Sequence, residues 1–335
     1  MKCLGIESTA HTFSCAVVDR KGNRGEILSD IRKIYGPPEG EGIHPREASR
    51  HHVEISSAVL AEALRKAKIS VDDLDIISYA AGPGLGPCLR VGAVVSRALS
   101  SYYKIPIYPV NHAIGHIELG KMLTGAKNPL VLLVSGGHTM LLAFSDKKWR
   151  VFGETLDITL GQLLDQFGRS IGFASPCGKK IEELAEKSNN YVSLPYSVKG
   201  NDVSFSGLLS AAKSIVNKGE EGACYSLQET AFAMICEATE RALAFTEKKE
   251  LMIVGGVAAN KRLSSMLESI CKRQKCKFFV VPQKFAGDCG SQIAWLGLLE
   301  ASVKKGTGLK NTFVKQSWRL DTCLLYTSPS PRDRG

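Results

Sequence analysis

The sequence predicts an α/β fold built from two similar halves. With 335 residues, the chain is too long for one ordinary core, so two domains are expected. Short apolar runs at residues 3–7 and 130–134 each pass through a small, hydroxyl-bearing turn into a second apolar run. In both halves, helical patterns then alternate with short buried strands, which is typical of α/β architecture.

The expected elements follow the same order twice. In the first half the strands are residues 3–7, 13–18, 25–31, 76–80 and 105–110. Their counterparts in the second half are residues 130–134, 140–144, 149–153, 251–254 and 278–281. Residues 46–68 carry apolar side chains at helical spacing, which predicts an amphipathic helix. Three hairpin-connected strands followed by alternating helices and strands, occurring twice, indicate an internal duplication.

Composition limits the class of protein. The formal net charge of +10 favours a polyanionic partner, with a basic proteome or plain solubility as the alternative. Ten scattered cysteines without a C-x-x-C pair predict reduced, mostly buried thiols. No apolar run reaches the ~18 residues that a membrane span needs, and no signal-peptide pattern is present. We therefore expect a cytoplasmic protein with no membrane partner.

His112 and His116 form the most informative local pattern. If residues 111–116 are helical, the two imidazoles project from one face, one turn apart. Such a pair can hold one divalent metal, with a third ligand from elsewhere leaving positions open for substrate. The spacing alone fits two surface or capping histidines equally well.

Three glycine-rich turns expose backbone N–H groups. Ser135, Gly136 and Gly137 leave room for phosphate oxygens to approach the amides. Residues 254–260 follow a strand and open a helix, which predicts an anion or nucleotide site at a helix N-terminus. Residues 82–87 predict either a backbone-exposing loop or a sharp reversal from strand to helix. None of the three is a P-loop or a dinucleotide fingerprint.

Taken together and in order, eight segments resemble one family. They are GIESTAHT, GIHPREASRHH, AGPGLGPCLRVG, NHAIGHIE, LVSGGHT, GETLDITLGQLLDQFGR, KIEELA and VGGVAAN. They look like the universal tRNA threonylcarbamoyladenosine transferase family, which includes the catalytic subunit of the KEOPS complex and the bacterial TsaD; His11 is closer to the archaeal and eukaryotic pattern. The resemblance implies an actin-like ATPase (ASKHA) fold, with two duplicated RNase H-like domains and a central nucleotide cleft.

The resemblance extends from about residue 1 to residue 318. It places the first domain at residues 1–128, with the metal-ligand histidines, and the second at residues 129–320, with the nucleotide-binding turns. Residues 321–335 do not resemble the family's ending, and we expect them to be an artefact or disordered.

The resemblance also implies site residues. The metal ligands are His112, His116 and Asp288, and the ion is iron or zinc, with Mg²⁺ as a further option. The adenine nucleotide, threonylcarbamoyl-AMP or ATP, is expected to contact Leu133, Val134, Ser135, Gly136, Gly137, Asp165, Gly178, Glu182 and Asn260. The sequence identifies no general base, and His138 is only a candidate for that role.

Three departures from the family pattern bear on these assignments. Archaeal members often have a tyrosine ligand where this chain has Leu133, which cannot ligate. Cys289 replaces the asparagine of Asp-Asn-Gly, and Cys177 lies in the segment that is otherwise Pro-Gly-Gly-Pro-Lys. Cys289 is either a further soft ligand or, as we expect, a small buried residue.

The implied function is transfer of threonylcarbamoyl from threonylcarbamoyl-AMP to the adenosine 3′ of the anticodon in ANN-decoding tRNAs. The implied partners are tRNA and either a small kinase-like ATPase with KEOPS accessory subunits or a paralogous bacterial-type partner. A small-molecule kinase-like ATPase of the same fold is an alternative function, but it leaves the histidine pair unexplained. A zinc peptidase is disfavoured because Ala113 occupies the position of the general-base glutamate. A non-catalytic scaffold also stays open.

Overall fold

The structure is a computed structural model that describes residues 1–322 except residues 23, 39 and 147. Most of the expected tail, 321–335, therefore lies outside the described residues. Two five-stranded sheets have the orders β3-β2-β1-β4-β5 and β8-β7-β6-β11-β12. In each sheet the first three strands are antiparallel, and the last two run parallel to the first. The identical order confirms the predicted duplication and the two-sheet α/β fold.

The first sheet contains β1 (Lys2–Glu7), β2 (Thr12–Lys21), β3 (Arg24–Ile34), β4 (Ile76–Gly82) and β5 (Ile107–Asn111). The second contains β6 (Leu130–Val134), β7 (Thr139–Ser145), β8 (Lys148–Glu154), β11 (Glu250–Val254) and β12 (Lys277–Val280), with a small hairpin, β9 (Val198–Lys199) and β10 (Asp202–Val203), alongside. The helices are α1 (Pro45–Ala67), α2 (Gly86–Tyr103), α3 (His112–Thr124), α4 (Leu160–Ser170), α5 (Gly178–Ala185), α6 (Ser206–Ser214), α7 (Glu220–Thr246), α8 (Lys261–Gln274) and α9 (Gly290–Ala301).

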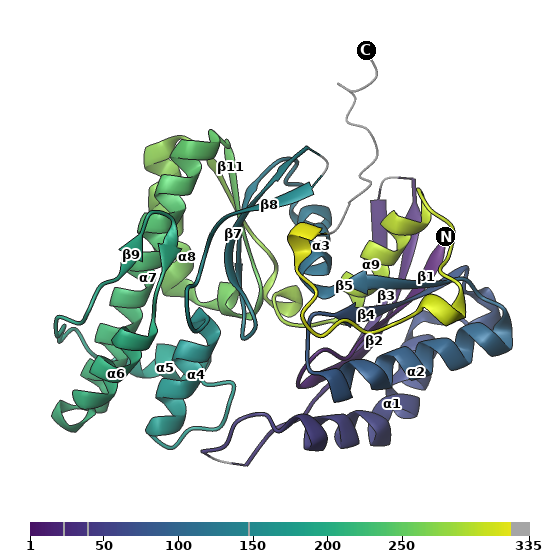
Figure 1. Cartoon of the computed structure of the whole chain (residues 1–335), viewed down its shortest axis with the longest axis horizontal. Coiled ribbons are helices and arrows are strands. Elements are labelled where there is room, and N and C mark those ends of the chain that lie inside the picture. The colour runs from purple at the N-terminus through teal and green to yellow at the C-terminus, as the bar shows by residue number, and fades with distance from the viewer. Residues whose placement is uncertain (23, 39, 147, 323–335) are drawn as a thin grey trace.

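The helices and sheets form alternating layers. Helices α1 and α2 cover the outer face of the first sheet, and α7 and its neighbours cover the outer face of the second. Helices α3 and α9 lie between the sheets (Figure 1), and their apolar residues join both sheets in one core cluster. Strand β6 is buried on both faces: Leu132 packs outward, whereas Leu133 packs toward α3 and α9. The inner layer is therefore shared by both halves.

Helix α9 packs unusually close to the first sheet, although it follows the last strand of the second half. A Cβ on Gly5 of β1 would lie 2.3 Å from the backbone nitrogen of Ala294 and from the carbonyl oxygen of Gly290. The strand and the helix thus approach backbone to backbone, which only glycine permits. The start of α9, which follows Asp288 in the chain, is held against β1 as a result. The expected domain boundary near residue 128 stays a prediction.

The segment after α9 returns along the first sheet. The backbone nitrogen of Lys315 donates to the carbonyl oxygen of Ala81, and that of Gly84 donates to Gln316. Arg319 then forms an ion pair of 3.5 Å with Glu154 on β8 of the second sheet. This segment thus touches both halves.

Two composition-based expectations can be compared with the described residues. Within residues 1–322, apart from the three omitted positions, the cysteines are free, and all but Cys276 are buried. This agrees with the expected reduced thiols. In the same part of the chain no helix is long and apolar enough to cross a membrane.

Gly5→Ala tests the close approach of β1 and α9. The added methyl has no space against the backbone of α9, so we expect a loss of about 1–3 kcal/mol in the free energy of unfolding. Gly207→Ala in α6 is the matched control, because a Cβ there meets nothing within 4 Å. Urea unfolding measures both variants, and equal stability of Gly5→Ala and the wild type would contradict the packing.

Candidate functional site

Two histidines and one aspartate meet in the layer between the sheets. The Nε2 atoms of His116 and His112 lie 3.2 Å and 3.5 Å from Oδ1 of Asp288. All three potential ligand atoms lie within 4.8 Å of one another. The two imidazole rings are nearly perpendicular, with centroids 4.7 Å apart. The structure therefore brings together the three residues that were predicted to bind metal.

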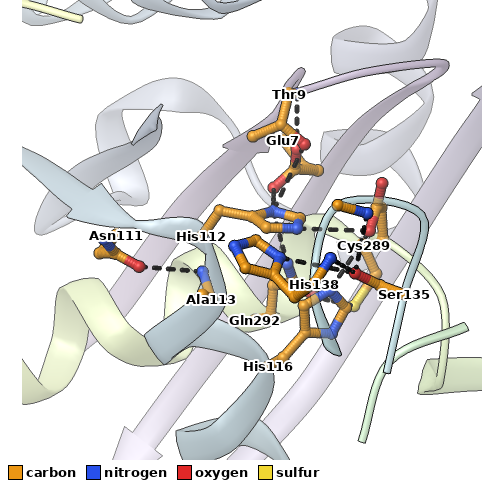
Figure 2. A network of polar contacts seen from close by, with 12 residues as sticks. Glu7, Thr9, Asn111, His112, Ala113, His116, Ser135, His138, Cys289 and Gln292 are labelled. Carbon is orange, nitrogen blue, oxygen red and sulfur yellow. Dashed lines mark hydrogen bonds and ion pairs between the residues drawn. The ribbon is translucent and has the colours of Figure 1, made fainter. Parts of the chain in front are cut away.

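The start of α3 fixes the two histidines. Oδ1 of Asn111 accepts hydrogen bonds from the backbone nitrogens of Ala113 (3.0 Å) and Ile114 (3.2 Å), as Figure 2 shows for Ala113. This N-cap makes His112 the first helical residue. His116 follows one turn later on the same face, as the spacing predicted.

The start of α9 fixes the aspartate. The hydroxyl of Ser14 on β2 accepts a hydrogen bond from the backbone nitrogen of Gly290, at 2.8 Å. The carboxylate of Asp30 on β3 accepts one from the backbone nitrogen of Ser291, at 3.1 Å. Side chains of the first sheet thus cap α9 and set the position of Asp288 just before it.

Charge is concentrated in this buried site. Burial alone would lower the pKa of His112, but the carboxylates of Glu7 and Asp288 outweigh it and raise this pKa to about 9. Burial alone would raise the pKa of the Asp288 carboxyl, yet His112 and His116 hold it well below its usual range. Burial lowers the pKa of His116. Without a metal, a proton on His112 is thus the cation that two carboxylates share.

Glu7 is a site residue that the sequence analysis missed. It is fully buried at the end of β1, and its Oε2 lies 2.8 Å from Nδ1 of His112 (Figure 2). Its Oε1 accepts a hydrogen bond from the backbone nitrogen of Thr9, at 2.6 Å. The only signal in the sequence was an acid that ends an otherwise apolar strand.

The donor set suits a divalent transition metal. Two imidazole nitrogens and one carboxylate oxygen are typical ligands of Zn²⁺ and Fe²⁺, whereas Mg²⁺ prefers oxygen alone. Burial raises the pKa of the Cys289 thiol well above its ordinary value, which disfavours the thiolate form that binds metal. Leu133 is fully buried in the inner core cluster. Three protein ligands would leave positions open for substrate.

The predicted phosphate-binding turn joins β6 to β7 beside this group. A Cβ on Gly136 or Gly137 would meet nothing within 4 Å, and both residues are exposed, so no side chain blocks the approach of a ligand to the turn. The turn is held by the hydroxyl of Ser135, which accepts hydrogen bonds from the backbone nitrogens of Gly137 and His138. Thr159, the N-cap of α4, donates to the carbonyl oxygen of Gly136 at 2.9 Å.

His138 links this turn to the histidines. Its ring lies 6.5 Å from that of His112, centroid to centroid. Burial, with His112 and His116 nearby, lowers the pKa of His138 to about 3. The ring is therefore neutral near pH 7 and a weak proton acceptor, which does not favour the general-base role.

The predicted adenosine contacts lie at two helix N-termini of the second half. Asp165 accepts a hydrogen bond from the backbone nitrogen of Cys177 before α5, and Glu182 accepts one from Lys261 at the start of α8, both at 2.7 Å. Within the described ranges, the second oxygen of each carboxylate makes no hydrogen bond. A ribose hydroxyl could use these free oxygens.

The remaining predicted contacts differ in what they can offer. Gly178 is the first residue of α5, and a Cβ there would make an ordinary contact with Cδ1 of Leu164 at 3.8 Å. Asn260 caps α8 through Oδ1, and its Nδ2 donates to Gln228, so its side chain is already engaged. The side chains of Leu133 and Val134 are buried in the core. The nucleotide contacts of these residues stay predictions.

A model of the TsaD family, tRNA N6-adenosine threonylcarbamoyltransferase, matches residues 26–295. A protein of that name from Caldivirga maquilingensis is 46% identical, over 96% of each chain. A protein from Methanocaldococcus jannaschii named probable bifunctional tRNA threonylcarbamoyladenosine biosynthesis protein is 49% identical; the match covers 96% of this chain and 59% of the relative.

Two solved structures share the fold at low identity. HypF from T. kodakarensis has a TM-score of 0.64 at 13% identity, over 91% of this chain and 48% of HypF. Component A of (R)-2-hydroxyglutaryl-CoA dehydratase from Acidaminococcus fermentans has a TM-score of 0.55 at 14% identity, over 90% of this chain and 99% of that one. These neighbours are members of the actin-like ATPase fold, which confirms the predicted fold class.

The metal group predicts that His116→Ala and Asp288→Ala each lose bound metal while remaining folded. Removing one of three ligands should weaken binding by several kcal/mol in order of magnitude, because water replaces neither its charge nor its geometry. His138→Ala is the control and should keep the metal. Elemental analysis and circular dichroism measure the three variants; full metal occupancy in either ligand variant would remove that residue from the site.

Gly256→Val tests the predicted nucleotide site at the start of α8. A Cβ at Gly256 meets nothing within 4 Å, so the fold should survive while the valine fills the space of the nucleotide. We expect AMP or ATP to bind at least about tenfold more weakly, a loss of about 1.4 kcal/mol.

Gly308→Val makes the same change in open space elsewhere and should leave nucleotide binding unchanged. Calorimetric titration compares the two variants. Unchanged affinity in Gly256→Val would remove residues 254–260 from the nucleotide site.

Proposed function

The chain belongs to the tRNA N6-adenosine threonylcarbamoyltransferase family, and we propose that a divalent metal on His112, His116 and Asp288 assists its reaction. The family makes it a transferase of the acyltransferase type. The proposed reaction transfers threonylcarbamoyl from threonylcarbamoyl-AMP to the adenosine 3′ of the anticodon in ANN-decoding tRNAs. The observation that carries this proposal is the three-ligand group beside the open turn at Gly136 and Gly137.

The nucleotide would lie along the second half of the chain. Phosphate oxygens can approach the exposed turn at Gly136 and Gly137, where no side chain is in the way. The free carboxylate oxygens of Asp165 and Glu182 can accept hydrogen bonds from ribose hydroxyls. We propose that this nucleotide site is the central cleft that the family resemblance implies.

The reaction itself needs few groups from the protein. The exocyclic amine of the target adenosine attacks the carbamoyl carbon, the bond from that carbon to the phosphate oxygen breaks, and AMP leaves as the amine loses a proton. When bound, the metal would act as a Lewis acid on an oxygen of the mixed anhydride. The two histidines and Asp288 would hold it in the layer between the sheets. The neutral ring of His138 is better suited to contact the substrate than to accept the proton.

The tRNA would contact the protein through charge and through a displaced base. The net charge of +10 favours an RNA backbone, and α8 carries basic residues at both ends. The target adenosine must leave its stack to reach a site between two sheets.

We also propose that the chain works with partners in the cytoplasm. A small kinase-like ATPase and KEOPS accessory subunits are the expected partners of an archaeal-like member, and a paralogous subunit is the bacterial counterpart. The bifunctional relative from Methanocaldococcus jannaschii is longer than the match to this chain, which leaves room for a second activity in that protein.

A kinase-like ATPase of the same fold is the second candidate function. It would use the turn and the carboxylates for ATP, but it gives no role to His112, His116 and Asp288. We therefore place it second.

A reconstituted transfer reaction tests the proposed function. The purified chain receives threonylcarbamoyl-AMP labelled in the threonine moiety and an ANN-decoding tRNA, with and without the partner subunits. We expect label on the tRNA, and its loss when the metal is removed with a chelator. A tRNA without the target adenosine is the control. Transfer of the γ-phosphate of ATP to a small hydroxyl compound, with no label on tRNA, would contradict the proposal.

A further inference from the structure

Glu7 has both carboxylate oxygens fixed. Oε1 accepts a hydrogen bond from the backbone nitrogen of Thr9 at 2.6 Å, and Oε2 faces Nδ1 of His112 at 2.8 Å. The side chain is fully buried, and the strand that carries it, β1, packs backbone to backbone against α9 at Gly5. Glu7 therefore cannot turn away from His112 without giving up a hydrogen bond.

The two ring nitrogens of His112 face different groups. Nδ1 faces Glu7, whereas Nε2 faces Asp288 at 3.5 Å. A neutral imidazole carries one N–H, and an ionised carboxylate can only accept a hydrogen bond. In the neutral ring that a bound metal requires, the hydrogen bond to Glu7 therefore puts the one proton on Nδ1 and leaves the lone pair of Nε2 directed toward Asp288 and His116.

Two uncharged neighbours of Nδ1 are compatible with this arrangement. The amide of Gln292 lies 3.1 Å away and the hydroxyl of Thr9 lies 3.4 Å away. A hydroxyl can accept, and the nitrogen and oxygen of an amide are interchangeable in assignment. Of these three contacts of Nδ1, the one with the carboxylate of Glu7 is the shortest. Glu7 is also the only charged group among the three.

The charge of Glu7 also needs a partner. Among the residues that the structure describes, its one ion-pair contact is with His112. A buried carboxylate without a compensating cation is costly. With a divalent ion bound and both histidines neutral, the charges of Glu7 and Asp288 together balance the charge of the ion.

We propose that Glu7 is a positioning residue for the metal site: through its hydrogen bond to Nδ1 it orients His112 to ligate through Nε2. This inference rests on the metal site of the proposed function, and it adds a residue outside the three ligands. Outer carboxylates of this kind fix the tautomer and the ring orientation of a ligating histidine.

The test is Co²⁺ binding by Glu7→Gln. Glutamine keeps the size of the side chain and removes its charge. The matched control is Glu118→Gln, because Glu118 is also a buried acid on the histidine helix but pairs with Lys121 at 3.1 Å rather than with His112. Metal-free proteins are titrated with Co²⁺ against a chromophoric chelator, and thermal unfolding by circular dichroism checks the fold.

We expect Glu7→Gln to bind Co²⁺ about 10–100-fold more weakly than the wild type, and Glu118→Gln to match the wild type. Equal affinity in Glu7→Gln and the wild type would overturn the role of Glu7. A wild-type protein that binds no Co²⁺ would instead overturn the metal site on which the inference rests.

The wild type alone provides a second test, which does not depend on whether the variant folds. In the Zn²⁺-loaded protein with ¹⁵N-labelled histidine, long-range ¹H–¹⁵N spectra should show His112 protonated at Nδ1 and bound to metal through Nε2. Metal on Nδ1, or a proton on Nε2, would overturn the proposal.

Discussion

Two carboxylates between apolar sheets, Glu7 fully buried and Asp288 partly buried, require a cation, and this requirement shapes the centre of the molecule. Glu7 and Asp288 approach His112 from opposite ring nitrogens, at 2.8 Å and 3.5 Å. Isolated buried carboxylates would be strongly destabilising. The protein therefore needs a positive charge at this point, which a proton on His112 or a divalent metal can supply. Such a site binds metal and proton in competition, because a ligating histidine must be neutral.

Helix starts and glycine contacts give the site its geometry. Asn111 caps α3 at His112, and Ser14 and Asp30 cap α9 just after Asp288. Gly5 allows β1 to approach α9 without a side chain between them. The two helix starts and the contact at Gly5 thus place Glu7, both histidines and Asp288 within one small volume. A substitution that moves α9 would move Asp288 with it.

Much of the fold could be predicted from the sequence, because local patterns determine it. The two hairpins, the continuous apolar run of β6 and the amphipathic helix α1 follow from periodicity. The packing of α9 on the first sheet could not, since it depends on contacts between residues such as Gly5 and Gly290 that no local pattern records. The turn at residues 82–87 proved to be the sharp reversal, with Gly86 already in α2.

The site was only partly predictable for the same reason. Helical spacing indicated the histidine pair and the family resemblance added Asp288, and the structure brings the three residues together. Glu7 was missed because an acid at the end of a strand usually faces solvent. Asn260 has a capping role that occupies its side chain, which the family pattern did not indicate.

X-ray absorption spectroscopy of the Zn²⁺- or Fe²⁺-loaded protein tests the central claim most directly, because it reports the atoms bound to the metal. We predict two imidazole nitrogens and a carboxylate oxygen, with the remaining positions taken by water oxygen and no sulfur. A sulfur ligand from Cys289, or a shell with fewer than two imidazoles, would contradict it.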